Sequence, residues 1–105
     1  MRLKVFEVDT LIAEAEVFSV DPPMGVVTAQ FFPTGAYNRS RHASVVDEVF
    51  VGERSDIIRI ETQDGAIVRS EGVSILDFPT LDEREIHILG IYEPSVDEMI
   101  KYLPS

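Results

Sequence analysis

The stretch IIRIETQDGAIVRS, residues 57–70, decides the predicted fold. Two runs rich in β-branched residues flank Asp64-Gly65, the dipeptide most typical of tight hairpin turns. A two-residue loop would place Ile58 and Ile60 on the same face as charged side chains, whereas a loop of odd length separates the two kinds. The odd register gathers Ile58, Ile60 and Val68 on one face and Arg59, Glu61, Arg69 and Glu71 on the other. The sequence therefore predicts an antiparallel hairpin with one apolar face.

Strand patterns continue toward the N-terminus. Residues 3–8 are rich in β-forming side chains and predict a first strand. Across residues 11–20 small apolar side chains alternate with glutamates, a period of two that favours a strand, although a helix is the rival interpretation. A strong turn at residues 21–25 precedes a second alternating run, with Val27, Ala29 and Phe31 on one face. We expect these two runs to form a hairpin.

The second half of the chain adds further elements. Residues 44–51 have a capping serine, but their valines lower helix propensity, so strand and helix both stay open. Residues 73–78 predict a strand that Pro79 ends, and residues 85–92 are apolar on both faces, which is typical of a strand inside a sheet. Residues 95–98 have the spacing of a capping box and predict a short amphipathic C-terminal helix.

These patterns define the expected fold class. Hairpins followed by one helix predict an α+β domain, mostly antiparallel β, with about six to seven short strands and a short C-terminal helix. A small β-barrel or sandwich is the alternative. A parallel βαβ arrangement is disfavoured, because the sequence lacks long helices between strands. At 105 residues, the chain is expected to be a single domain over 1–105. From residue 34 to residue 44 we expect a surface loop.

Charge and composition limit the partners and the location. Nineteen acidic residues against nine basic ones give a net charge of -10, which disfavours nucleic acid and anionic membranes as partners and leaves cationic ones open. The absence of cysteine excludes disulfides and thiolate ligands or nucleophiles. No apolar run approaches the ~20 residues of a membrane-spanning helix, and the start does not resemble a signal peptide. We therefore expect a cytoplasmic protein without a membrane partner.

One loop concentrates polar functional groups. The segment 37–42 supplies the candidate ligand-binding residues Tyr37, Arg39, Arg41 and His42. Tyrosine and histidine can exchange protons, and arginine can hold a carboxylate or phosphate through two hydrogen bonds. The plainer interpretation is a solvated turn in which the arginines pair with some of the many acids and Tyr37 buries its ring.

Other polar residues carry weaker signals. His87 is expected to be a core histidine with one satisfied hydrogen bond, since metal sites need three or four converging ligands. A facial triad of His42, His87 and Asp47 has no spacing in its favour. The GxGxxG, Walker, GxSxG and HExxH motifs are all missing. The sequence therefore assigns no cofactor, no metal and no catalytic residue.

Two functions from different classes remain. The favoured one is a non-enzymatic protein-interaction or binding module, whose partner is another protein or a second copy in a homodimer, because short antiparallel sheets with exposed edges pair across two-fold axes. The alternative is a small enzyme or anionic-ligand-binding protein, with Arg39 and Arg41 orienting an anion and His42 transferring a proton. This alternative requires the loop side chains to converge on one concave, partly desolvated surface.

Overall fold

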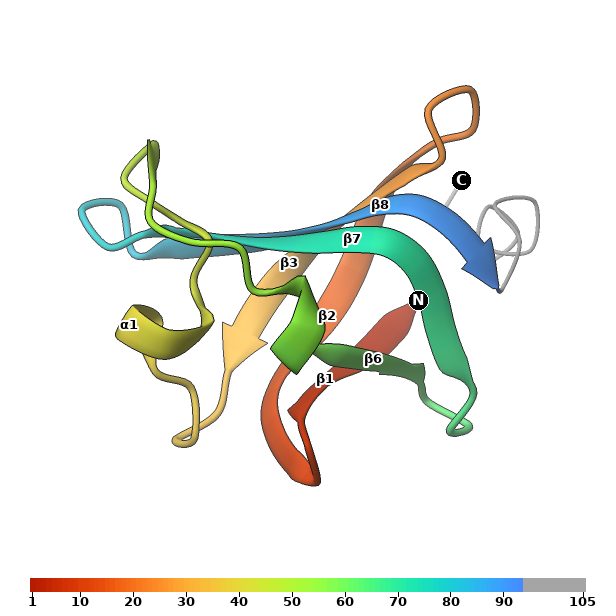
Figure 1. The fold of residues 1–105 in the computed structure, drawn as a ribbon, viewed down its shortest axis with the longest axis horizontal. Helices are drawn as coiled ribbons and strands as arrows, with labels where there is room; N and C mark the ends of the chain where they lie inside the picture. Colours follow the sequence, from red (N-terminus) through yellow and green to blue (C-terminus); the bar gives the residue numbers. More distant parts are fainter. Residues whose placement is uncertain (94–105) are drawn as a thin grey trace.

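Six strands of one continuous sheet close into a barrel in the computed structural model, which describes residues 1–93 (Figure 1). Around the barrel the order is β7-β6-β1-β2-β3-β8, and β8 returns to β7 to close the ring. Every neighbouring pair in this ring is antiparallel. The elements are β1 (Arg2–Glu7), β2 (Thr10–Asp21), β3 (Val26–Pro33), α1 (Arg39–His42), β4 (Val45–Val46), β5 (Val49–Phe50), the 3₁₀ turn η1 (Ser55–Ile57), β6 (Arg59–Thr62), β7 (Ile67–Phe78) and β8 (Glu83–Glu93).

Alternate residues of the strands fill the barrel interior. On β2, Ala13, Ala15 and Val17 are buried, whereas Phe18 is 55 % exposed on the outer face, which confirms the strand and not the helix over this segment. Small side chains fit here because six strands enclose a narrow space. The core comprises Leu3, Val5, Ile12, Ala13, Ala15, Val17, Val27, Ala29, Phe31, Ile60, Val68, Ile75, Ile86, Ile88 and Ile91.

The hairpin at residues 57–70 forms in the predicted register. Ile60 lies opposite Val68, and both are buried. The loop between the strands is therefore odd in length, as the separation of apolar and charged faces requires. Thr62 N–H donates to the Ala66 carbonyl at 2.8 Å, and Gly65 has φ +89°, a left-handed conformation that glycine adopts without strain. This hairpin is confirmed.

The α+β prediction is wrong for residues 1–93, where the alternative, a small β-barrel, is found. The mostly antiparallel sheet is confirmed, but β2, β7 and β8 are 11 or 12 residues long where short strands were expected. Long strands can tilt and bend around a barrel, so the sheet covers its own apolar face without a helix. Within these residues no helix has the length and apolar character that crossing a membrane needs. The predicted C-terminal helix lies outside the described residues.

The structure corrects the prediction for one segment and decides between the two alternatives for another. Residues 66–70 and 73–78, predicted as separate strands, form the single strand β7 because it pairs with β8 along most of its length. Residues 44–51, left open between strand and helix, form the β4–β5 hairpin. Asp47 and Glu48 make its turn with φ of 46° and 71°, the positive values that two-residue hairpin turns favour. The hairpin lies outside the barrel, where β4 runs parallel to the end of β7.

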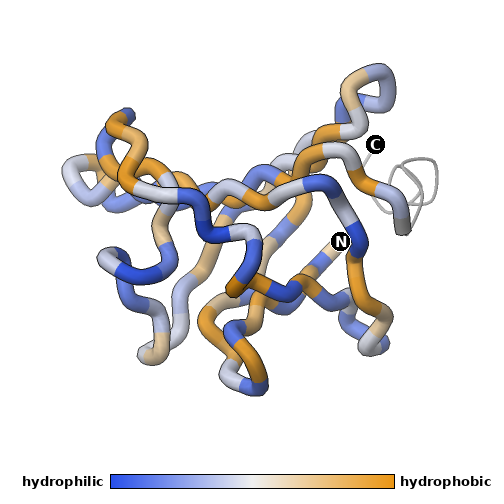
Figure 2. Tube along the Cα trace, viewed as in Figure 1, coloured by the Kyte–Doolittle hydropathy of each residue, from blue (hydrophilic) through white to orange (hydrophobic). Residues whose placement is uncertain are grey.

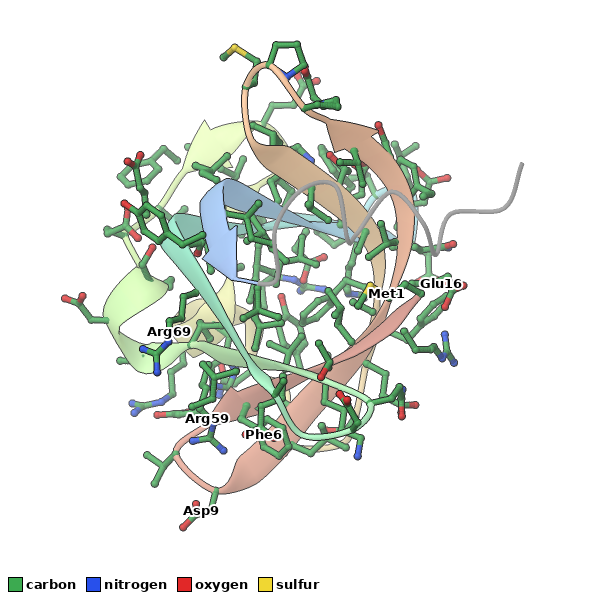
Figure 3. The ribbon with its side chains drawn as sticks, turned by 90° about the vertical axis from the view of Figure 1, so that its right-hand side faces the viewer. Met1, Phe6, Asp9, Glu16, Arg59 and Arg69 are labelled. Carbon is green, nitrogen blue, oxygen red and sulfur yellow. The ribbon has the colours of Figure 1, made fainter. Side chains whose placement is uncertain are left out.

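The outer wall carries charges and aromatic rings. Figure 3 shows Arg59 beside Phe6, with the guanidinium carbon 4.7 Å from the ring centroid. The same view shows the chain's amino group at Met1 close to Glu16, at 3.5 Å. His87, predicted as a core histidine, is instead half-buried on this outer wall, because strand alternation gives the interior to its neighbours Ile86 and Ile88.

Candidate functional site

Residues 34–44, here called the plug loop, lie across one end of the barrel, where Figure 1 shows α1. The Tyr37 ring packs on the core, with its centroid 5.2 Å from that of Phe31 and 5.7 Å from that of His42. His42 and Ala43 are buried. The expected surface loop is therefore wrong for residues 42–44, which are buried, while residues 38–41 are exposed as expected.

A buried carboxylate on β7 anchors the first half of the plug loop. Asp77 is fully buried, and its Oδ2 accepts hydrogen bonds from the Tyr37 hydroxyl at 2.7 Å and from Arg39 Nε at 3.0 Å. Burial, and after it the hydrogen bond to Asp77, raises the pKa of Tyr37 above its ordinary value. The same carboxylate raises the pKa of Arg39. These contacts hold the loop against the barrel wall.

The second oxygen of Asp77 has a different environment. Arg84 Nε, from β8, lies 3.3 Å from Asp77 Oδ1. Both atoms are buried and neither has a hydrogen bond, so this contact is an ion pair without the directed geometry of a bond. One buried carboxylate thus lies between the guanidinium groups of Arg39 and Arg84.

A second carboxylate, at the end of β1, anchors the other half of the plug loop. Arg41 Nε lies 2.8 and 2.7 Å from the two Glu7 oxygens, and Arg41 Nη2 also contacts Glu7. His42 Nε2 lies 2.7 Å from Glu7 Oε1. The hydrogen bonds from Arg41 first, and from His42 second, lower the pKa of Glu7 to about 2.

The contacts of His42 define which ring nitrogen carries the proton. Asn38 N–H donates to His42 Nδ1 at 2.9 Å, so this nitrogen accepts. A proton on Nε2 then donates to Glu7, and the neutral ring satisfies both partners. His42 is therefore a buried bridge between the backbone of the plug loop and the end of β1.

The four residues that the sequence grouped as one site belong to two clusters. Tyr37 and Arg39 meet at Asp77, while Arg41 and His42 meet at Glu7. Sequence reasoning missed Asp77, Arg84 and Glu7. Asp77 had one signal, since a carboxylate inside the apolar run of residues 75–78 needs a partner if the run is buried. That the four predicted residues bind a ligand stays a prediction.

A shallow, solvent-open depression of about 560 Å³ adjoins the plug loop. Its lining consists of Asn38, Ser40, Arg41, Arg54 and Ile57. Arg54 donates to the carbonyls of Ala43 at 3.1 Å and Ser40 at 3.2 Å, so it fixes the loop as well as lining the depression. Within residues 1–93, no three histidine, aspartate or glutamate side chains are grouped to hold a metal ion.

The β4–β5 hairpin presents the opposite kind of surface. Three consecutive apolar side chains are exposed: Val49 by 62 %, Phe50 by 67 % and Val51 by 46 %. Figure 2 shows these residues as a hydrophobic stretch on the hairpin that projects above α1. The turn at residues 79–82 lies beside it, because Thr80 Oγ1 donates to Asp47 Oδ1 at 2.9 Å. Leu81 on that turn is 66 % exposed.

Comparison with known proteins gives no match, whether to a family model, to a curated protein or to a solved structure. Residues 1–93 form a small closed β-barrel with an internally paired polar loop and an exposed apolar hairpin.

Proposed function

We propose that the chain is a non-enzymatic protein-interaction module whose contact surface is the β4–β5 hairpin. The observation that carries this proposal is the exposure of Val49 and Phe50, which form β5, and of Val51 directly after it, at the edge of the sheet that residues 1–93 form. A single exposed apolar residue is ordinary on a protein surface. Natural proteins, however, protect free strand edges with charges, proline or a covering element, because unpaired edges attract other strands. An apolar edge therefore favours a contact with another chain.

The plug loop supports the non-enzymatic part of this proposal. Arg39 and Arg41 already contact carboxylates of the chain itself, at Asp77 and Glu7. Both ring nitrogens of His42 have partners within the chain. An anionic substrate would have to displace these carboxylates before the arginines could orient it. The same side chains are sufficient to explain why the loop is ordered across the barrel end.

Site-specific photocrosslinking tests the module directly. A photoreactive phenylalanine analogue is placed at position 50, and the matched control carries it at position 18, an exposed phenylalanine on the outer face of β2. We expect protein adducts in the source cells from position 50 and not from position 18. An adduct of twice the chain mass indicates a homodimer, and other masses indicate a different protein. Equal crosslinking from both positions contradicts the proposal.

The depression beside the plug loop supports a second candidate function, the binding of a small anion. Arg41 is 59 % exposed and shares this depression with Arg54. An anion at one hundred times its dissociation constant would stabilise the fold by ~2.7 kcal/mol. A thermal-shift titration with phosphate and citrate tests it, with Arg41→Gln as the variant that should lose the shift. A melting temperature that stays constant for the unsubstituted protein contradicts anion binding.

A further inference from the structure

The free edge of β5 offers one backbone donor and one acceptor. Val51 N–H donates to the Ser44 carbonyl at 2.8 Å, so the backbone groups of Val51 face β4. Because these groups alternate in direction along a strand, the N–H and C=O of Phe50 face away from β4. Among residues 1–93, β5 is the terminal strand of the sheet and pairs with β4 alone. An extended chain can therefore add to the sheet at Phe50.

Side chains on both faces of β5 are available to such a chain. Val49 and Val51, the residue directly after β5, lie on one face of this extended segment, and Phe50 lies on the other. All three are exposed, so the hairpin projects from the barrel and leaves both faces uncovered. A partner strand with apolar side chains at neighbouring positions would cover them from the edge. The backbone pair alone offers two hydrogen bonds, and these apolar contacts supply further affinity.

The charges around the hairpin determine which partner fits. The exposed acidic residues on the hairpin, just after it, on the neighbouring turn and at the start of β8 are Asp47, Glu48, Glu53, Asp82 and Glu83. The two arginines near these acids already have partners, since Arg54 donates to carbonyls of the plug loop and Arg84 pairs with Asp77 and Asp82. The segment 47–53 itself contains no lysine or arginine, and the whole chain has a net charge of -10. A second copy would bring these acids against one another. A basic partner gains from the same charges, and the gain weakens as salt rises.

We infer that the hairpin binds an extended segment of another protein, apolar at its centre and flanked by lysine or arginine, which pairs with β5 as an added strand. This inference rests on the proposed function and names the chemistry of its partner. The backbone of Phe50 pairs with the segment, and the side chains of Val49, Phe50 and Val51 bind its apolar centre. The exposed acidic residues around the hairpin, here called the acidic rim, attract its basic flanks.

A selection from a library of random displayed peptides tests this inference. The counter-target is Phe50→Pro, which removes the outward N–H while leaving the bonds to β4 intact, because those bonds do not involve Phe50. Phe50→Leu keeps both the N–H and an apolar side chain. We expect enriched peptides with an apolar β-branched or aromatic centre and basic flanks. They should bind Phe50→Pro at least about tenfold more weakly, and Phe50→Leu nearly as well as the unsubstituted protein.

Charge reversal tests the acidic rim separately. Glu48→Lys should weaken the enriched peptides and reduce the salt dependence of their binding. Glu14→Lys, the same charge change on β2, is the matched control and should leave the affinity nearly unchanged. Equal losses of peptide affinity in the two variants overturn the role of the rim, because the net charge of the protein would then explain both losses. Circular dichroism and melting curves confirm that each variant is folded.

The other outcomes separate this inference from the proposed function. Peptides that need Phe50 but have neutral or acidic flanks overturn the inference and leave the interaction module standing. Sedimentation at micromolar concentration could instead show a dimer that Phe50→Pro dissociates. A second copy of the chain would then occupy the hairpin, which overturns the inference and leaves the interaction module standing. Peptides that bind Phe50→Pro as tightly as the unsubstituted protein overturn the inference, and they count against the hairpin as a contact surface. A failure to enrich any peptide also overturns the inference, while crosslinking at position 50 still tests the module.

Discussion

The plug loop and the β4–β5 hairpin follow one another in the chain and meet at Ser44, but the plug loop pairs its polar side chains with the barrel, whereas the hairpin leaves its apolar side chains exposed. The plug loop contains tyrosine, two arginines and histidine, and it places them against carboxylates of the barrel. The hairpin contains consecutive valine and phenylalanine residues, and it leaves them in solvent. The comparison teaches that a polar loop becomes structural when the fold supplies its counter-charges, whereas an apolar segment stays exposed when no surface of the fold covers it.

The carboxylates explain the difference in physical terms. Asp77 is fully buried, and a buried charge is tolerated only with partners and hydrogen bonds. Tyr37 and Arg39 supply those partners, and their contacts with Asp77 hold the plug loop against the barrel. The hairpin is fixed through backbone contacts: Ser44 N–H donates to the Ile75 carbonyl at 2.8 Å, and Asp47 N–H to the Asp77 carbonyl at 2.9 Å. Its apolar side chains take no part in these bonds.

The largest expected effect comes from removing the buried anchor of the plug loop. Asp77→Ala leaves the Tyr37 hydroxyl and two guanidinium groups without their shared acceptor, and breaking a buried ion pair in this way costs about 3–5 kcal/mol. Urea unfolding measures the loss. Asp82→Ala is the matched control, because that carboxylate is 90 % exposed and also pairs with Arg84. If Asp77→Ala does not fold, Asp77→Asn preserves the shape and should still be destabilised. A loss no larger than that of Asp82→Ala would show that the cluster does not hold the loop.

A smaller effect is expected from one hydrogen bond of the same cluster. Tyr37→Phe keeps the ring on the core and removes the hydroxyl that donates to Asp77, so unfolding should require about 1.5–3 kcal/mol less. Tyr92→Phe removes the corresponding hydroxyl from an exposed contact with Glu71, and it should change stability by less than about 0.5 kcal/mol. Paired urea titrations compare the two variants. Equal losses in the free energy of unfolding would mean that the Tyr37 hydroxyl is as accessible to solvent as the Tyr92 hydroxyl.

The second anchor predicts a pH dependence. The pKa of Glu7 falls from 4.5 to about 2 on folding, so its contribution to stability is fully present above about pH 4.5 and is lost as the pH falls toward 2. In Glu7→Gln, the free energy of unfolding should therefore fall less over this interval than in the unsubstituted protein. Urea titrations at successive pH values measure the difference, with Glu48→Gln on the exposed hairpin turn as the control. Parallel curves for Glu7→Gln and the unsubstituted protein would contradict the role of the Arg41 and His42 contacts.

The smallest effect on stability is expected at the hairpin. Phe50→Thr replaces an exposed side chain with a β-branched residue that suits a strand, so the free energy of unfolding should change by no more than about 0.5 kcal/mol. The buried counterpart Phe31→Ala should lose about 3–5 kcal/mol. Urea unfolding ranks the two. A large loss at position 50 would mean that Phe50 supports the fold, and the comparison between loop and hairpin would then fail.

Local patterns predicted much of the barrel wall. The odd hairpin register at residues 57–70 followed from the need to separate Ile60 and Val68 from charges, and alternation along residues 12–20 gave the buried face of β2. The same reasoning placed His87 in the core, where it does not lie, because residues 85–92 are apolar on both faces and alternation then does not show which face points inward. Local patterns leave the barrel as an alternative only, since its closure depends on the pairing of β8 with β7, and alternation along either strand does not say which strand it pairs with.

The candidate site was predictable only in part. The polar residues at positions 37–42 stood out, but their partners Glu7 and Asp77 are 34 to 40 residues away in the chain. No spacing rule joins residues at that separation. The apolar character of residues 49–51 was visible in the sequence, but their exposure was not, because short apolar runs are buried in most folds.

By itself, the sequence determined most of the barrel strands, the turns at residues 21–25 and 64–65 and the register of the central hairpin, because these depend on backbone preferences and on alternation over a few residues. The tertiary structure alone decided that the sheet closes, that Asp77 and Glu7 each anchor one part of the plug loop, and that among residues 1–93 β5 ends the sheet with its apolar side chains exposed. The physical reason is that burial and charge pairing are properties of surfaces brought together from distant parts of the chain.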